Sequence, residues 1–202
     1  MFIKLFLVPF DFKHFFMKKI TTITTFLLCT FCIMLTLKSN GQALNSSDIK
    51  AELATDWQRA KDYTNEYLNT MPANKYNARA VDSLRSFAAQ MLHLAAANIF
   101  LMSIATGDQP LPWTSFDLES RTTAQSRDSV VYYVNASYDF CMSAVKNSDP
   151  NKWGEKVKAF GQFEGSRFAF MQKAFEHQTH HRGQTTIYIR LQNIKPPQEK
   201  LF

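Results

Sequence analysis

The chain has 202 residues, 46% of them hydrophobic and 14% aromatic, with only 6 Gly and 7 Pro, a composition that favours long helices over many short strands. Its formal net charge of +6 comes mostly from the first 43 residues, which hold five lysines and one aspartate and leave 18 basic and 16 acidic residues in the remainder. So balanced a remainder does not predict a nucleic-acid-binding surface.

The first 43 residues are predicted to be a leader. From Met17 the chain has two lysines, a long and largely apolar run, and small residues before Ala43. This is the pattern of a secretory signal peptide over residues 17–43, cleaved after Ala43, and it predicts a periplasmic or secreted protein. We interpret residues 1–16 as an upstream extension that precedes the true start at Met17. The alternative is an uncleaved membrane anchor, because the apolar run approaches the length of a spanning helix.

The cysteines give no sign of a disulfide framework. Cys29 and Cys32 form a CxxC pair, but they lie inside the apolar leader, where no folded redox site exists. After cleavage Cys141 is the single cysteine, and one cysteine cannot form an internal disulfide. Cys141 lies on an apolar helical stripe, so we expect a buried small hydrophobic residue rather than a catalytic thiol.

Residues 44–202 are predicted to form one domain of four helices. Apolar residues recur at helical spacing in four stretches, separated by polar segments, prolines and Gly107. The predicted helices run from Asn45–Asp48 to Met71, from about Val81 to Thr106, from about Arg121 to Lys146, and from about Ser166 to Asn193. The segment 152–165 is expected to be an ordered loop or a short helix. Four helices, each about 30–40 Å long, predict an all-α four-helix bundle.

Three histidines stand together near the end of the last predicted helix. At about 100° per residue, His177 and His181 lie about 40° apart and one turn from each other, so both can reach one metal ion. They continue the stripe of residues that faces the core. His180 lies about 60° from His177 on the other side. We therefore place His180 on the flank of the stripe, where it could support the ligands.

A metal ion needs at least a third ligand, and His93 is the candidate. It lies in the middle of the second predicted helix, with apolar residues on almost every side. An unpartnered imidazole buried there would cost about 1–3 kcal/mol, so it should have a partner. A bond to a carbonyl or carboxylate would explain His93 alone, but the HxxxH pair on a neighbouring helix favours a ligand. The sequence thus predicts a metal site made by His93, His177 and His181.

The same residues resemble a known family. The C-terminal signature of the DinB-like superfamily is similar to HQTHHRGQ at 177–184, YIR at 188–190 and PP at 196–197, and LHLA at 92–95 matches the family's upstream histidine. The resemblance covers about residues 48–197. It implies a four-helix bundle of the DinB-like type that holds a divalent ion, commonly zinc or nickel, on His93, His177 and His181.

The resemblance leaves two functions open. Three neutral imidazoles leave a fourth position for water or substrate, which is the arrangement of a catalytic site. The first function is a metal-dependent hydrolase or thiol-type transferase acting on an unidentified small molecule, although export makes cytosolic thiols doubtful co-substrates. The second is a non-catalytic metal-binding or stress-related bundle. The sequence also leaves a homodimer open, and it predicts no stable membrane insertion once the signal peptide is removed.

The remaining polar residues near the histidines have weaker signals. No general base can be identified, because Glu164 and Glu176 are candidates only by their proximity in sequence and are expected to be solvated charges. Arg182 is expected to bond structurally rather than to bind substrate. Gly183, in a helix interior, predicts a close approach of another helix. Tyr188 and Arg190 are expected to pack and to lie on the surface.

Overall fold

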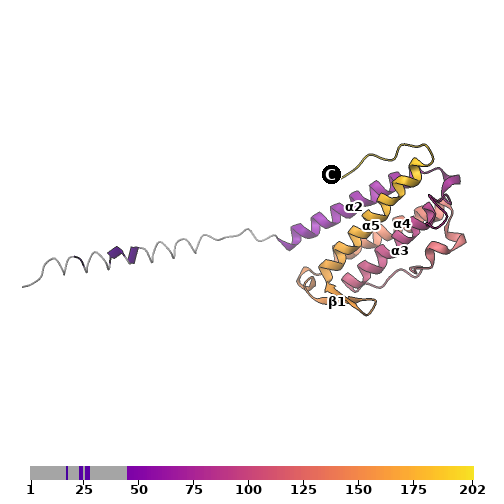
Figure 1. Ribbon diagram of the computed structural model, residues 1–202. Helices are drawn as coiled ribbons and strands as arrows, with labels where there is room; N and C mark the ends of the chain where they lie inside the picture. The colour runs from indigo at the N-terminus through magenta and orange to yellow at the C-terminus, as the bar shows by residue number, and fades with distance from the viewer. Residues whose placement is uncertain (1–16, 18–22, 25, 28–44) are drawn as a thin grey trace, which may run out of the picture. The chain divides into compact units, whose positions relative to one another are not determined.

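Four long helices make up most of the chain from Asn45 onward (Figure 1). The structure is a computed structural model that describes residues 45–202 and residues 17, 23, 24, 26 and 27. The predicted signal peptide, its cleavage after Ala43 and the predicted extension 1–16 lie outside the described residues, apart from those five positions. Residues 45–202 form one unit of four packed helices, which confirms the predicted all-α four-helix bundle.

The helices are joined by short 3-10 turns and one hairpin. The helices are α2 (Ser46–Thr70), α3 (Phe87–Thr106), α4 (Arg127–Asn147) and α5 (Arg167–Arg190). The strands are β1 (Lys156–Ala159) and β2 (Phe163–Ser166). The 3-10 turns are η1 (Ala73–Lys75), η2 (Leu118–Ser120), η3 (Thr122–Ala124) and η4 (Pro150–Lys152).

Side-chain caps fix where the helices begin. Asn45 accepts a hydrogen bond from the backbone N–H of Ser47. At the start of each of the other three helices, a serine accepts a hydrogen bond from the backbone N–H three residues later: Ser86, Ser126 and Ser166. Each cap satisfies an N–H group that has no partner within its helix. Gly107 ends α3 with a left-handed backbone conformation, at a φ of 85°. The predicted start at Asn45 and the predicted end at Gly107 are both confirmed.

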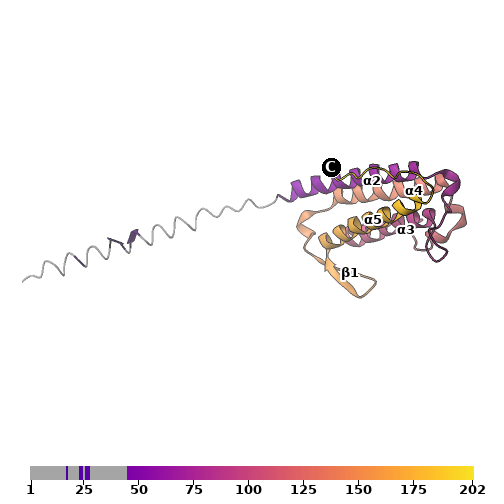
Figure 2. The same ribbon diagram turned by 45° about the horizontal axis from the view of Figure 1, so that its top comes forward.

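The contacts between helices show how they run. Lys61 on α2 pairs with Asp139 on α4 at 2.6 Å, and Lys50, earlier on α2, bonds the carbonyl of Ser148 at the far end of α4. These two helices are therefore antiparallel. The same holds for α3 and α5, because Arg167 at the start of α5 bonds the carbonyl of Ala105 at the end of α3. Figures 1 and 2 both show α3 and α5 side by side.

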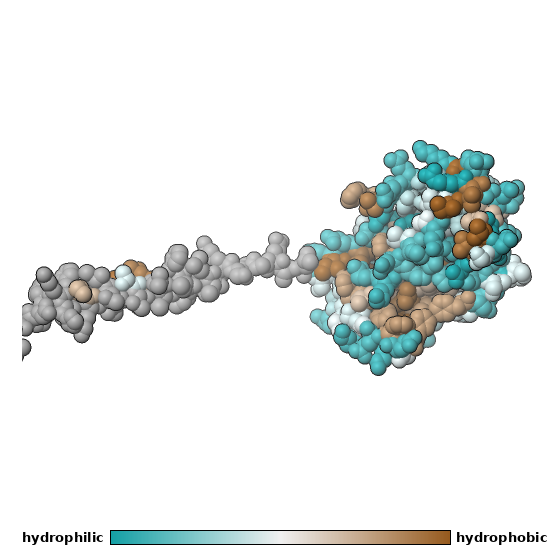
Figure 3. All heavy atoms as spheres, in the orientation of Figure 1, coloured by the Kyte–Doolittle hydropathy of each residue, from teal (hydrophilic) through white to brown (hydrophobic). Residues whose placement is uncertain are grey.

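The core is centred on α3, which packs against both α4 and α5. Leu92, Leu94 and Ile99 have no exposed surface, and full burial of each such side chain stabilises the fold by about 1.5–3 kcal/mol. Length and composition would allow α3 to cross a membrane, but 72% of its apolar window is buried in the bundle, so the core position explains its hydrophobicity. Polar residues cover most of the bundle face shown in Figure 3.

Cys141 on α4 is fully buried. Burial raises the pKa of its thiol well above the ordinary value, which keeps the group protonated and unreactive. Its sulfur lies 3.6 Å from the carbonyl oxygen of Asn98 on α3. The prediction of a buried small hydrophobic residue is confirmed.

Two helices begin later than predicted. The second starts at Phe87 rather than near Val81, because Ser86 caps it, and Val81 and Leu84 are 56% and 48% exposed in the preceding turns. The third starts at Arg127 rather than near Arg121, because η2 and η3 occupy the residues before its Ser126 cap. Val81 and Leu84 continue the apolar pattern upstream of α3, whereas residues 121–126 before α4 hold a single apolar residue, Ala124.

The segment before α5 was predicted to be a loop or a short helix, and this was wrong. It forms an antiparallel hairpin in which Lys156 pairs with Ser166 and Ala159 with Phe163. Phe160 and Gly161 both take positive φ values, of 51° and 71°, which closes the turn. The hairpin projects from one end of the bundle (Figure 2).

Candidate metal centre

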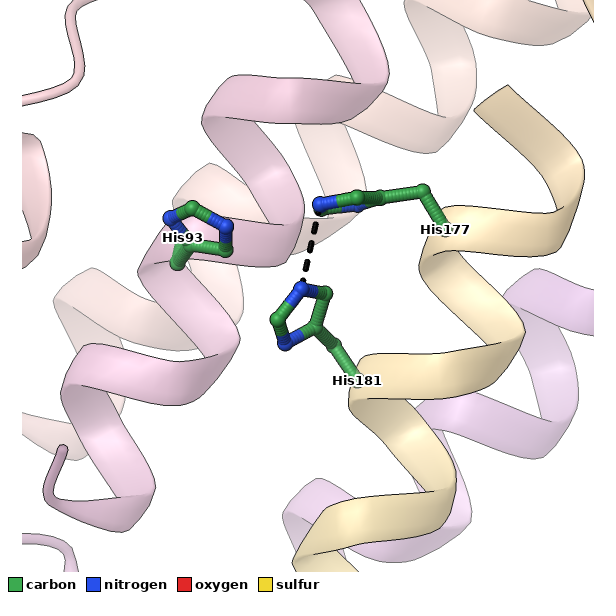
Figure 4. Close-up of side chains that lie close together, drawn as sticks. All are labelled: His93, His177 and His181. Atoms are coloured by element: carbon green, nitrogen blue, oxygen red, sulfur yellow. Dashed lines mark hydrogen bonds between the residues drawn. The ribbon is translucent and has the colours of Figure 1, made fainter. Parts of the chain in front are cut away.

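Antiparallel packing of α3 and α5 brings the three predicted ligands together. His93 projects from the middle of α3 toward His177 and His181, which lie one turn apart on α5 (Figure 4). The ring centroid of His93 lies 5.2 Å from that of His177 and 4.6 Å from that of His181. One ring nitrogen from each residue lies within 4.8 Å of the other two. Residues 84 positions apart in the chain thus form one cluster of nitrogen donors.

The ring nitrogens of the α5 pair are placed as two ligands of one ion would be. Nε2 of His177 lies 3.0 Å from Nε2 of His181 (Figure 4). Two nitrogens bound tetrahedrally at about 2.0–2.1 Å from an ion are about 3.3 Å apart. Without an ion, one Nε2 must carry a proton and donate to the other. The Nδ1 atoms of both rings are buried and have no hydrogen-bond partner within the described chain.

The electrostatics keep the rings neutral. Burial, and after it the charges of the neighbouring histidines and Arg85, lower the pKa of His177 to about 4 and that of His181 to about 3. The pKa of His93 is also lowered, chiefly by burial and then by Arg85, although Glu119 opposes the shift. Only the neutral imidazole has a lone pair for a metal ion. The residues therefore fit a divalent ion in number, donor type and protonation state.

A carboxylate orients His93. Oε2 of Glu119, in η2, lies 2.5 Å from Nδ1 of His93, while Oε1 accepts a hydrogen bond of 2.8 Å from Nε of Arg85. With Nδ1–H donated to the carboxylate, the Nε2 lone pair of His93 is left for an ion. A carboxylate behind a histidine is a recurrent support for metal ligands.

Glu119 was not predicted from the sequence. It lies in the long connection between α3 and α4, where no periodicity assigns a direction to a side chain. Its only signal was that the half-buried His93 required a polar partner. Glu164 and Glu176, the candidates from the sequence, lie elsewhere: Glu164 pairs with Lys158 on the hairpin, and Glu176 is exposed on α5.

A groove of about 620 Å³ opens beside the cluster. His181, Glu119 and Arg85 line its polar side, and Leu84 and Ile187 are among its apolar lining. His180 also lines it, with its ring centroid 4.9 Å from that of His181. A groove of this size can take a small molecule next to the histidines.

Comparison with known proteins identifies the family. Residues 41–200 match the DinB family along most of the chain. The chain belongs to the DinB family. The cluster of His93, His177 and His181 is typical of the metal site of DinB proteins.

Two solved structures share the DinB fold. A DinB-like protein from Bacillus cereus ATCC 10987 is similar with a TM-score of 0.63 and 16% identity, over 73% of this chain and 95% of that one. A DinB-like protein from Bacillus subtilis is similar with a TM-score of 0.57 and 14% identity, over 75% of this chain and 96% of that one. At these identities the likeness concerns the fold. No functionally curated protein matches the chain significantly.

The other residues of the DinB signature lie outside the histidine cluster. Arg182 is only 5% exposed and bonds Oε1 of Gln178 at 2.7 Å, as expected for a structural residue. Tyr188 is 4% exposed and donates a hydrogen bond to the carbonyl of Arg85, whereas Arg190 is exposed. The prediction for Gly183 was wrong, because a Cβ atom there would meet nothing within 4 Å. Within residues 45–202 no helix packs against Gly183, which is exposed.

Proposed function

We propose that this DinB protein holds a divalent ion, zinc or nickel, on His93, His177 and His181 and uses it in hydrolysis or group transfer on a small molecule. The observation that carries the proposal is the 3.0 Å separation of two Nε2 atoms whose rings have no partner for Nδ1 in the described chain. A shared ion would bind both Nε2 atoms in place of the hydrogen bond between them, and His93 would supply the third donor.

The surrounding residues prepare the cluster for this role. Burial keeps the three rings neutral at physiological pH. The hydrogen bond from His93 to Glu119 fixes which nitrogen of His93 faces His177 and His181. Arg85 donates to the other carboxylate oxygen of Glu119. The cluster would therefore bind an ion without large rearrangement, which favours affinity.

The groove favours catalysis over a purely structural ion. A structural site is closed by four protein ligands, whereas this cluster has three histidines and a groove beside it. An ion there would act as a Lewis acid that activates water or a thiol for attack. The apolar side chains of Leu84 and Ile187 would bind the body of a substrate, and Arg85 and His180 would face its polar part.

Export is a separate part of the proposal. The leader pattern over residues 17–43 supports secretion to the periplasm or beyond, with cleavage after Ala43. N-terminal sequencing of the protein purified from its own host should then find Leu44 as the first residue. Retention of residues 1–16 would contradict both the cleavage and the start at Met17.

Activity measurements test whether the metal-loaded protein is an enzyme. Protein loaded with zinc or nickel is screened with esters, amides and thiol adducts, in parallel with His177→Ala and with Glu176→Gln as an exposed control on the same helix. We expect turnover of at least one class, abolished by a chelator and by His177→Ala but kept in Glu176→Gln. Metal-loaded protein that turns over none of these would favour the non-catalytic, stress-related bundle.

A further inference from the structure

The α5 helix has a second polar feature on the side away from the histidines. At about 100° per residue, Thr179 points about 160° away from His177, and Arg182 lies on the same side as Thr179. These residues face α2 and the C-terminal segment after α5. Between them lies a pocket of about 310 Å³, whose lining includes Tyr63, Tyr67, Thr179 and Arg182. The pocket shares no lining residue with the groove beside the histidines.

Arg182 is a buried cation whose close partners are all neutral. Its Nη1 atom donates to Oε1 of Gln178 at 2.7 Å and lies 3.5 Å from the carbonyl oxygen of Ala60. Its guanidinium carbon lies 4.7 Å from the ring centroid of Tyr63. Within residues 45–202, no carboxylate oxygen lies within 4.0 Å of this guanidinium. A buried charge without a counter-charge is costly, so a site for an anion is expected nearby.

The free donors of Arg182 are available in this pocket. Its Nε and Nη2 atoms make no hydrogen bond to the described residues, and the side chain lines the pocket. A guanidinium with two open N–H groups matches the two oxygens of a carboxylate or phosphate. The hydroxyls of Tyr63 and Tyr67 are hydrogen-bonded to each other at 3.3 Å, which leaves at most one proton of the pair for a ligand.

The other charges of the pocket are already paired, with one exception. Arg59 bonds Asp56 at 2.9 Å, and Lys200 pairs with Glu66. The exception is Glu199, the one carboxylate among the described residues that line the pocket, which is exposed and makes no ion pair within 4.0 Å. The carboxylate of Glu199 therefore competes with an incoming anion for the positive charge of Arg182.

The C-terminal segment forms one wall of the pocket. Arg59 donates to the backbone carbonyl of Lys200 at 2.8 Å, which holds this segment against α2. Leu201 and Phe175 contribute apolar surface to the lining. The lining thus combines the cationic side chain of Arg182 with the apolar side chains of Phe175 and Leu201. The volume of the pocket is at the small end of the range for ligand pockets.

We propose that this pocket is a binding site for a small oxyanion, a carboxylate or a phosphate, with Arg182 as its anchor. The site is independent of the metal centre and of the function proposed for it. The oxyanion would receive hydrogen bonds from Nε and Nη2 of Arg182, and an apolar group attached to it would contact Phe175 and Leu201.

Binding of two probes to the full chain tests the site. Benzoate and inorganic phosphate are titrated separately by calorimetry, with chloride as the buffer anion, and they distinguish an organic carboxylate from a phosphate. We expect saturable binding of at least one probe at one equivalent. Glu199→Gln should tighten it several-fold, and Arg182→Gln should weaken it by at least about tenfold.

A steric variant covers the case in which Arg182→Gln does not fold. Gly183 lines the pocket and has open space at its Cβ position, so Gly183→Leu should fill part of the pocket while leaving Arg182 in place. This variant should keep the fold and lose probe binding, and His177→Ala should bind like wild type. The proposal is overturned if neither wild type nor Glu199→Gln binds a probe, if Gly183→Leu binds normally, or if His177→Ala abolishes binding.

Discussion

Nδ1 of His93 lies 2.5 Å from Oε2 of Glu119, and this contact joins the middle of α3 to the connection that leads to α4. The carboxylate fixes the ring of His93 and leaves Nε2 to face the pair on α5. The candidate metal centre therefore includes a residue of this connection as well as residues of two helices. Its other carboxylate oxygen is held by Arg85, just before α3.

Removing this carboxylate should weaken metal binding. We expect Glu119→Ala to lower the affinity for zinc by about 10–100-fold, because His93 loses the acceptor that sets its tautomer. Competition with a chromophoric chelator measures this directly. Glu176→Gln, an exposed change on α5, is the matched control and should bind zinc like wild type. Equal affinity in Glu119→Ala and Glu176→Gln would show that Glu119 has no such role.

The metal-free protein should lose stability as the pH falls from about 7.5 to about 5. The pKa of His177 is about 4 and that of His181 about 3 in the folded state, whereas unfolded histidines titrate near about 6.5. The unfolded chain thus binds protons first, so stability is fully present above the unfolded pKa and declines below it. Urea unfolding in the presence of a chelator tests this, and the pH range avoids most carboxylate titration. His177→Gln should flatten the decline, and a wild-type stability that rises toward pH 5 would contradict the account.

Gly183→Ala should stabilise the bundle. Gly183 lies inside α5, and a Cβ atom would meet nothing within 4 Å. Alanine is preferred over glycine in a helix interior by about 1 kcal/mol, so the free energy of unfolding should rise by a similar amount. Chemical denaturation gives the value. A clear loss of stability would mean that α5 is crowded at this position after all.

Tyr138→Phe should destabilise the core. The fully buried hydroxyl of Tyr138 donates to Oε1 of Gln178 at 2.8 Å and lies 2.7 Å from Oγ1 of Thr64. Both partners keep another hydrogen bond, so we expect a modest loss of about 1–1.5 kcal/mol in the free energy of unfolding. Tyr132→Phe, at a residue that is 61% exposed, is the control and should change stability little. Equal effects of the two variants would argue against this network.

Periodicity was sufficient to predict the four helices and the histidine cluster. Ligands on helices have directions set by 3.6 residues per turn, so His177 and His181 could be placed on one face and His180 on another. The structure agrees, since His181 is buried and His180 is exposed. His93 followed because a polar residue inside an apolar helix needs a partner.

Features outside the helices could not be predicted in this way. Glu119 reaches His93 from a 3-10 turn, and the direction of its side chain depends on tertiary packing. The hairpin before α5 depends on positive φ values at Phe160 and Gly161, and phenylalanine does not usually favour that conformation. The helix α3 begins late because Ser86 caps it, although the apolar residues further upstream continue the helical pattern.

The metal content of purified protein tests the central claim most directly. Wild type, His177→Ala and His180→Ala are exposed to zinc or nickel, dialysed, and measured by elemental analysis. His180 is the matched control because it is an exposed histidine on the same helix. The account predicts about one ion per chain in wild type and in His180→Ala, and a large loss in His177→Ala. Trace metal in wild type, or an undiminished content in His177→Ala, would contradict it.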